Sequence, residues 1–204
     1  MSVAKRSGAV ERTAVIERKT AETDVAVAVD LDGKGKVKAR TGVGFLDHML
    51  THVAVHGVID LEISARGDLH VDEHHTVEDV GIALGQAVAR ALGDKRGIAR
   101  YGEATVPMDE ALAQVVLDLS GRAHLSYEDG LAPGKIGTVD RELFREFFEA
   151  FARSAGATAH VRVLAGRNGH HVIEAVFKAF GRALGAATRI DERRCGVPST
   201  KGSL

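Results

Sequence analysis

Apolar and polar residues follow two different periods along the chain, and the changes of period divide it into elements. A period of two predicts strands, and it runs over residues 25–31, 37–41, 58–65, 104–106, 112–119 and 158–164. Spacing of three and four predicts helices over residues 45–56, from residue 74 to a glycine stop at Gly93, 140–155 and 170–188. We expect Asp140 to cap the third helix and Gly156 to end it. The pattern predicts an α/β (α+β) fold with sheets backed by helices.

The two halves of the chain also repeat each other in sequence. Segment His74–Ala87 (HHTVEDVGIALGQA) aligns without gaps with His170–Ala183 (HHVIEAVFKAFGRA), and 7 of the 14 positions are identical. Upstream, residues 30–33 (DLDG) resemble residues 118–121 (DLSG). Two matches in the same order indicate a duplication. We therefore expect a single catalytic domain over residues 1–204, with homologous halves at about 9–93 and 102–190 and a tail at about 191–204.

Composition excludes several classes of protein. The net charge is −1, with acidic and basic residues mixed along the chain, which argues against nucleic acid as a partner. No apolar run reaches the ~18 residues that a membrane span needs, and the first 16 residues lack the core of a signal peptide. The single cysteine, Cys195, cannot form an internal disulfide, which fits a reducing compartment. These features predict a cytoplasmic protein without a membrane partner.

Histidine and glutamate recur at metal-ligand spacing in both copies of the repeat. On a helix, His74 projects beside Glu78, and His170 beside Glu174, because residues four apart share a face. The neighbouring histidines, His75 and His171, point about 100° away, which suits two metal ions better than one. Imidazole with carboxylate suits Mn, Fe or Zn, and the lack of nearby cysteine weakens a structural zinc site. One such motif is also typical of a solvated helix start, but two copies at equivalent positions favour a metal site.

Two further candidate ligands come from the repeat. His48 lies beside Asp47, which could orient its imidazole, and in repeat register it corresponds to Glu146. Both are therefore candidate ligands. The remaining histidines are expected to be structural, namely His52, His56, His70, His124 and His160.

At these residues the chain closely resembles the imidazoleglycerol-phosphate dehydratase family. The matching stretches, spread from about residue 9 to the C-terminus, are GVGFLDHMLTH, HVDEHHTVEDVGIALGQA, VPMDEALAQVVLDLSGR, GRNGHHVIEAVFKAFGRAL and GVPSTKG. The resemblance implies a hydro-lyase of histidine biosynthesis that converts D-erythro-imidazoleglycerol phosphate to imidazole-acetol phosphate. It also implies a duplicated half-domain of the ribosomal protein S5 domain 2-like type. The expected assembly is a homo-oligomeric 24-mer built from trimers, with active sites between subunits and two Mn(II) ions in each.

The resemblance also assigns roles to individual residues. It implies the metal ligands His48, His74, His75, Glu78, His170, His171 and Glu174, with Glu146 as the eighth, where other members have histidine. It makes Glu22 a proton shuttle that contacts substrate. It implies that the substrate is also bound by Arg100, Arg122, Ser199 and Lys201. Without the resemblance, the sequence predicts only that Glu22 is an exposed loop carboxylate. It would also predict that each arginine forms a surface ion pair and that the tail is a disordered end.

The implied chemistry suits these ligands. Dehydration removes a hydroxyl from the carbon beside an imidazole ring, and no carbonyl acidifies the C–H bond there. Metal coordination to both ring nitrogens would give an imidazolate, then a diazafulvene-like intermediate and an enol that ketonises. Two rival readings stay open from the motifs alone. One is a hydrolase that activates water with a dinuclear metal, and the other is a metal-binding shell without catalysis.

Overall fold

Each half of the chain contributes a four-stranded sheet and two long helices to the computed structural model, which describes residues 11–131 and 133–204. The first sheet has the order β1-β2-β4-β3, with strands Thr13–Lys19, Thr23–Asp30, Asp60–Gly67 and Val37–Arg40. The second has the order β5-β6-β10-β7, with strands Tyr101–Met108, Ala111–Asp118, Thr158–Ala165 and His124–Glu128. In each sheet the first three strands are antiparallel and the fourth is parallel to its neighbour.

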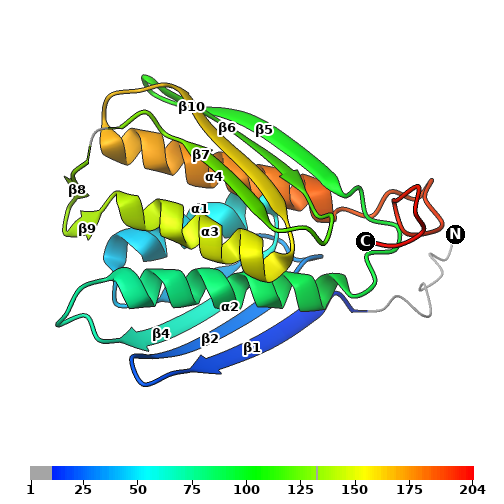
Figure 1. The fold of residues 1–204 in the computed structure, drawn as a ribbon, viewed down its shortest axis with the longest axis horizontal. Helices are drawn as coiled ribbons and strands as arrows, with labels where there is room; N and C mark the ends of the chain where they lie inside the picture. Colours follow the sequence, from blue (N-terminus) through cyan, green and yellow to red (C-terminus); the bar gives the residue numbers. More distant parts are fainter. Residues whose placement is uncertain (1–10, 132) are drawn as a thin grey trace, which may run out of the picture.

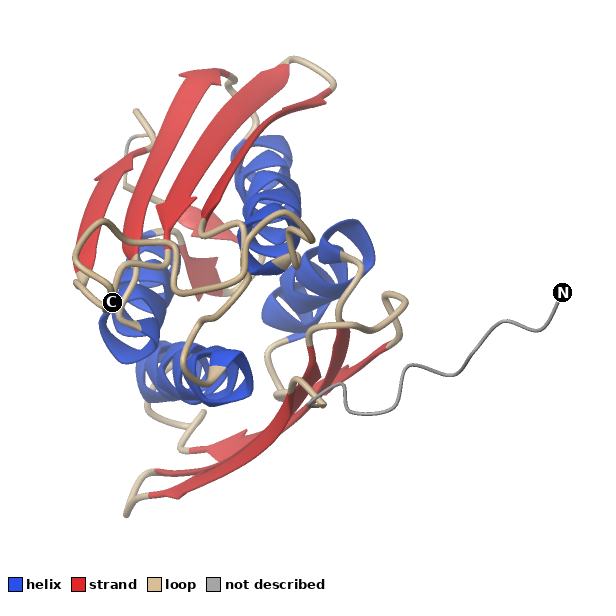
Figure 2. Cartoon of the chain, turned by 90° about the vertical axis from the view of Figure 1, so that its right-hand side faces the viewer, coloured by secondary structure: helices blue, strands red, loops and turns tan. Residues whose placement is uncertain are grey.

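The helices form a layer between the two sheets (Figures 1 and 2). They are α1, α2, α3 and α4, with bounds Gly44–Gly57, His74–Leu92, Glu142–Ala155 and Gly169–Thr188. Alternation puts one face of each sheet against this layer, as in β2, where Val25, Val27 and Val29 are buried. The largest buried side chains are phenylalanines of α3 and α4, which pack ring against ring.

Helices from different halves pack together closely because glycine lies at the crossings. A Cβ atom on Gly81 of α2 would lie 2.7 Å from the carbonyl oxygen of Phe147 in α3. A Cβ atom on Gly181 of α4 would lie 2.7 Å from the carbonyl oxygen of Val53 in α1. Backbones this close fix both crossings, so α2 is seated on α3 and α1 on α4.

The prediction of a duplicated α/β fold with helix-backed sheets is confirmed, and most predicted elements are present. Strands β1 and β7 and the small hairpin β8–β9 (Lys135–Ile136 and Val139–Asp140) were not predicted. The predicted cap was wrong: Asp140 belongs to β9, and α3 begins after Arg141 without a side-chain cap. Gly156 does end α3, in the left-handed conformation. Strand β4 begins at Asp60 because Val58, with φ of 55°, ends α1.

Two expectations concern residues 1–10, which lie outside the described residues: the absence of a signal peptide there and the start of the first half near residue 9. Within the described part of the chain, no helix combines the length and the apolar character needed to cross a bilayer.

Candidate metal centre and anion pocket

The start of α2, the start of α4 and two hairpin turns all lie at the left-hand end of the molecule in Figure 1. Strands β4 and β10 run toward this end, and the chain then turns back into helices that begin with the histidine pairs. Side chains fix both helix starts. Asp72 accepts the backbone N–H of His74 at 2.8 Å, and Asn168 accepts that of His170 at 3.0 Å. The turn before β2 carries Glu22.

Several donor groups converge on the buried carboxylate of Glu174. Its Oε2 lies 3.3 Å from Nε2 of His48 and 3.2 Å from Nε2 of His170. Its Oε1 lies 3.5 Å from Nε2 of His52 and 2.6 Å from Nζ of Lys178. Burial opposes ionisation, but the hydrogen bond from Lys178 and the nearby charges of His52 and Lys178 lower the pKa of Glu174 to about 2. The group is therefore a carboxylate anion at neutral pH.

His52 lies in this cluster, whereas a purely structural role was expected for it. Within residues 11–131 and 133–204, His48, His52 and Glu174 form the one group of three potential ligands whose ligand atoms all lie within 4.8 Å of one another. Burial lowers the pKa of His52 to about 4, so its imidazole is neutral and can donate a lone pair. The signal in the sequence was its spacing, since it follows His48 by one helical turn.

The second histidine of each pair is held by a carboxylate through Nδ1. Nδ1 of His75 lies 3.0 Å from Oδ2 of Asp68, and Nδ1 of His171 lies 2.7 Å from Oε2 of Glu110. These hydrogen bonds raise the pKa of each histidine. Because a carboxylate only accepts, Nδ1 carries the proton, and Nε2 of each neutral ring is left with its lone pair.

The other predicted ligands do not join one cluster within a single chain. The rings of His74 and His75 lie 5.9 Å apart, and Glu78 accepts a hydrogen bond from Arg153 at 3.2 Å. Glu146 is half-buried on α3 and outside the group at Glu174. The structure thus brings His48, His170 and Glu174 together and leaves the remaining five predicted ligands apart.

The four residues expected to hold phosphate meet at the opposite end of the molecule. Arg100, Arg122, Ser199 and Lys201 line a pocket of about 710 Å³. The red tail that forms one wall of the pocket lies at the right of Figure 1. Arg194 also lines this pocket and was not among the residues predicted to bind substrate. Arginine and lysine side chains around one hollow suit an anion.

Arg100 fastens the tail to the second sheet. Its Nε and Nη2 donate to the two carboxylate oxygens of Asp118 at 2.6 and 3.0 Å, and its Nη1 donates to the carbonyl of Pro198 at 2.8 Å. The hydrogen bond to Asp118 raises the pKa of Arg100. Arg122 lies 3.6 Å from the same carboxylate and is largely exposed, so it is the more available cation.

The two groups of site residues are separated by the length of a helix. His170 lies at the start of α4, and the tail follows its end. A helix of 20 residues is about 30 Å long at 1.5 Å per residue. A small phosphorylated molecule cannot reach both ends of one chain.

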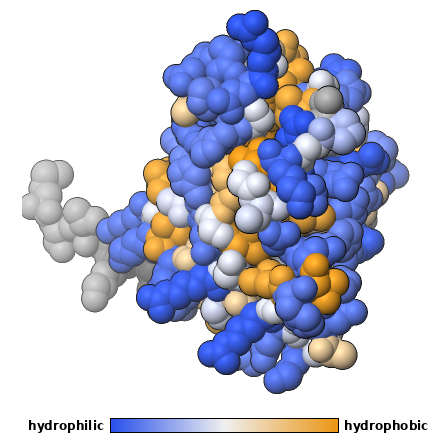
Figure 3. All heavy atoms as spheres, turned by 90° about the vertical axis from the view of Figure 1, so that its left-hand side faces the viewer, coloured by the Kyte–Doolittle hydropathy of each residue, from blue (hydrophilic) through white to orange (hydrophobic). Residues whose placement is uncertain are grey.

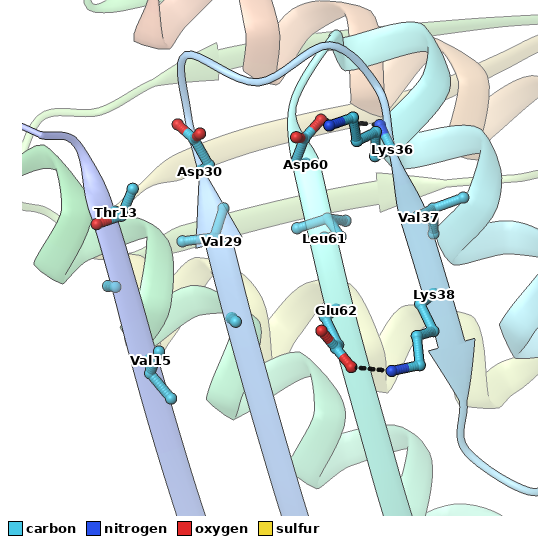
Figure 4. A pocket seen from close by; sticks show the side chains of 12 residues that line it. Thr13, Val15, Val29, Asp30, Lys36, Val37, Lys38, Asp60, Leu61 and Glu62 are labelled. Carbon is cyan, nitrogen blue, oxygen red and sulfur yellow. Dashed lines mark hydrogen bonds and ion pairs between the residues drawn. The ribbon is translucent and has the colours of Figure 1, made fainter.

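A further hollow is unrelated to either group. It has a volume of about 420 Å³ and lies on the outer face of the first sheet, between Val15 and the ion pair of Lys38 with Glu62 (Figure 4). No predicted site residue lines it. Figure 3 shows instead the end with the histidine pairs, where apolar groups are exposed among polar ones. Leu69 and Val71, in the loop before α2, are 38% and 62% exposed.

Comparisons with known proteins identify the family of the chain. Residues 41–184 match the family model "Imidazoleglycerol-phosphate dehydratase". The enzymes of that name from Methylococcus capsulatus and Synechococcus sp. (strain WH7803) are 61% and 60% identical over 194 residues, which is 95% of this chain and 98% and 96% of theirs.

Solved structures give the same result. The imidazoleglycerol-phosphate dehydratase of Staphylococcus aureus subsp. aureus N315 superposes with a TM-score of 0.79 at 42% identity, covering 88% of this chain and 99% of that one. The structure from Pyrococcus furiosus has a TM-score of 0.78 at 37% identity, covering 93% and 100%. The chain therefore belongs to the imidazoleglycerol-phosphate dehydratase family of hydro-lyases.

Proposed function

We propose that this protein dehydrates D-erythro-imidazoleglycerol phosphate to imidazole-acetol phosphate in histidine biosynthesis, at a site made by more than one subunit and loaded with two Mn(II) ions. The observation that carries the proposal is the placement of two complementary half-sites. Imidazole and carboxylate ligands gather at one end of the chain and cations at the other, as a substrate with an imidazole and a phosphate requires.

The donor groups at the helix-start end fit Mn(II). They are imidazole nitrogens and carboxylate oxygens, and the single cysteine, Cys195, lies in the tail at the other end. The residues that would hold the ions are His48, His74, His75, Glu78, Glu146, His170, His171 and Glu174. What bound Mn(II) would supply is stabilisation of the substrate ring in its deprotonated form, which helps the hydroxyl group leave the carbon beside the ring.

Glu22 is the group that would move the proton in this dehydration. It lies in the turn before β2, with its side chain 55% exposed and its Oε2 3.8 Å from Nδ1 of His75. Its own backbone N–H donates to Thr20, which fixes the turn. Among the hydrogen bonds of the described residues, none ends on the Glu22 carboxylate, so it is free to act on a substrate beside the metal ligands.

The anion pocket would hold the phosphate. Arg122 and Lys201 offer exposed charged groups, and Ser199 offers a hydroxyl. Arg100 uses three of its five N–H groups in fastening the tail, which leaves two for an anion. Fixing the phosphate at one end of the substrate would hold the imidazole in register with the metal ligands of the neighbouring subunit.

The separation of the two half-sites supports active sites between subunits, as in a 24-mer built from trimers. A mixing experiment tests this. A double variant, His75→Ala with His171→Ala, removes metal ligands, and Arg122→Ala with Lys201→Ala removes cations. Each alone should be inactive. Particles co-assembled from equal amounts should regain activity at roughly a quarter of their sites, because each intact half-site occurs in half of the subunits.

The assay itself uses Mn(II), imidazoleglycerol phosphate and detection of the ketone product. Release of inorganic phosphate without ketone would support a hydrolase instead. Tight Mn(II) binding without turnover of this substrate would support a metal-binding shell. Mixed particles as inactive as their parents would mean that one chain holds the whole site.

A further inference from the structure

The two halves place a glutamate at the same point of equivalent hairpins. Glu22 directly precedes the first residue of β2, and Glu110 directly precedes the first residue of β6. Each approaches the second histidine of the nearby pair, but at different distances. Glu110 Oε2 is 2.7 Å from Nδ1 of His171, whereas Glu22 Oε2 is 3.8 Å from Nδ1 of His75. Equivalent carboxylates are therefore used differently.

Glu110 is fully engaged as a support for its histidine. One oxygen accepts the Nδ1 proton of His171, and the other accepts the backbone N–H groups of Arg167 at 3.3 Å and Asn168 at 2.8 Å. Three donors fix this carboxylate and, through it, the plane of the imidazole. It has little freedom to shuttle a proton.

In the first half, Asp68 supports the histidine in place of the hairpin glutamate. Its oxygens lie 3.0 and 3.2 Å from Nδ1 of His75. The single N–H group at Nδ1 of His75 thereby donates its hydrogen bond to the nearer and less exposed carboxylate, since the Asp68 side chain is 17% exposed and that of Glu22 is 55% exposed. Glu22 remains beside the ring without a hydrogen bond to it.

The second half has no carboxylate at the position of Asp68. Gly67 and Gly166 are equivalent, because a Cβ atom on either would overlap the residue that follows the histidine pair, Thr76 at 2.0 Å or Val172 at 2.5 Å. The residue after Gly166 is Arg167, a cation that cannot accept a proton from imidazole. Each half thus has one carboxylate that holds the second histidine of its pair: Asp68, which follows β4, in the first half, and Glu110, which precedes β6, in the second.

We propose that Asp68 is a positioning residue that orients His75 toward the metal and, by occupying Nδ1, keeps Glu22 free for proton transfer. The proposal rests on the proposed function, because that function gives Glu22 a proton to move. Removal of Asp68 would allow Glu22 to close a gap of about 1 Å and accept the hydrogen bond that the Nδ1–H group of His75 then offers. The variant would then lose both metal affinity and its free carboxylate.

The test compares variants of the full-length assembled protein. The set is Asp68→Ala, Asp68→Asn, Glu110→Ala, Glu22→Gln, the double variant Asp68→Ala with Glu22→Gln, and Glu62→Gln as control. Glu62 is an exposed carboxylate of β4 that pairs with Lys38 on the outer face of the sheet. Free Mn(II) is measured by electron paramagnetic resonance to obtain its dissociation constant, and kcat is measured at saturating Mn(II).

Asp68 and Glu110 should both affect Mn(II) affinity, but only Asp68 should affect proton transfer by Glu22. Asp68→Ala and Glu110→Ala should each weaken Mn(II) binding about 10- to 100-fold, with Asp68→Asn in between because it keeps an acceptor oxygen. At saturating Mn(II), Asp68→Ala should have a kcat roughly tenfold or more below that of Glu110→Ala. Adding Glu22→Gln to Asp68→Ala should cost little more, because Glu22 is already diverted.

Two results would overturn the proposal: Mn(II) affinity of Asp68→Ala equal to that of the Glu62→Gln control, or losses of kcat from Asp68→Ala and Glu22→Gln that multiply in the double variant. Failure of the proposed function gives a different result. The unaltered protein would then make no ketone, while the Mn(II) dissociation constants would still decide whether Asp68 orients His75.

Discussion

Lys178 and Glu174 lie one turn apart on α4, with Nζ 2.6 Å from Oε1, at the point where the imidazoles of His48 and His170 meet the same carboxylate. The carboxylate is buried, so its charge is stable only because these donors surround it. The ammonium group balances the anion in the metal-free chain. A bound cation would share the carboxylate with Lys178.

Stability of the metal-free protein should therefore depend on Glu174 at low pH. The pKa of this group falls from an ordinary 4.5 to about 2 in the folded chain, so folding favours its ionised form. The stabilisation is complete above about pH 4.5 and is lost as the pH falls through about 2. In chelator-treated protein, the free energy of unfolding in urea should fall more steeply over this window for the parent than for Glu174→Gln.

The control is Glu149→Gln, an exposed position on α3, which should keep the slope of the parent. Equal slopes for the parent and Glu174→Gln would contradict the assigned coupling.

Substitution of Gly181 by alanine should destabilise the fold by about 1–3 kcal/mol. The added Cβ atom would lie 2.7 Å from the carbonyl oxygen and 2.9 Å from the Cα atom of Val53, and neither backbone atom can move without shifting α1. Urea midpoints measure the loss. Gly44→Ala is the matched control, since nothing lies within 4 Å of its new Cβ and no loss of stability is expected. A Gly181→Ala variant as stable as this control would show that the crossing is not tightly packed.

Asp118→Asn should weaken substrate binding more than it slows turnover. The asparagine keeps one acceptor oxygen for the two N–H groups of Arg100, and the charge that orients the guanidinium is lost. KM for the phosphorylated substrate should rise about tenfold or more, and the tail should become more sensitive to limited proteolysis. Asp30→Asn serves as control, because it alters an equivalent strand end that has no arginine partner of this kind among the described residues. An unchanged KM in Asp118→Asn would show that the pair of Arg100 with Asp118 does not contribute to substrate binding.

Glu22→Gln should keep its metal content and its assembly but lose turnover, because the amide cannot accept and return a proton. Metal analysis and size-exclusion chromatography of the purified variant check the first two properties, and the ketone assay checks the third. Normal activity of Glu22→Gln would exclude Glu22 from the mechanism.

Period-two patterns predicted the strands that have one well-buried face, such as β2 and β6. They did not predict β1 or β7, because these edge strands bury few side chains and end in charged residues. The Asp140 cap failed for a similar reason: the residue types suited a helix start, but a local hairpin used Asp140 as a strand residue. A strand that is stabilised by pairing with a distant or irregular segment need not show a period-two pattern of apolar residues in its own sequence.

The candidate site was predictable where ligands repeat along one helix. His170 and Glu174 are an example. The same spacing connects His48 with His52, although His52 was expected to be structural. The supports of the imidazoles were not predictable, because Asp68 and Glu110 reach their histidines from other elements. The separation of metal ligands from the anion pocket is likewise a property of the fold alone.

The crossing of helices between halves has a consequence for the origin of the chain. Both helices of the first half pack on helices of the second, α1 on α4 and α2 on α3, so neither half covers its own apolar helix face. Cleavage in the connection at 93–100 should give two fragments that refold only together. An ancestral single-copy protein of this shape would have needed a second identical chain to close its interior, and fusion of two gene copies would make that pairing permanent.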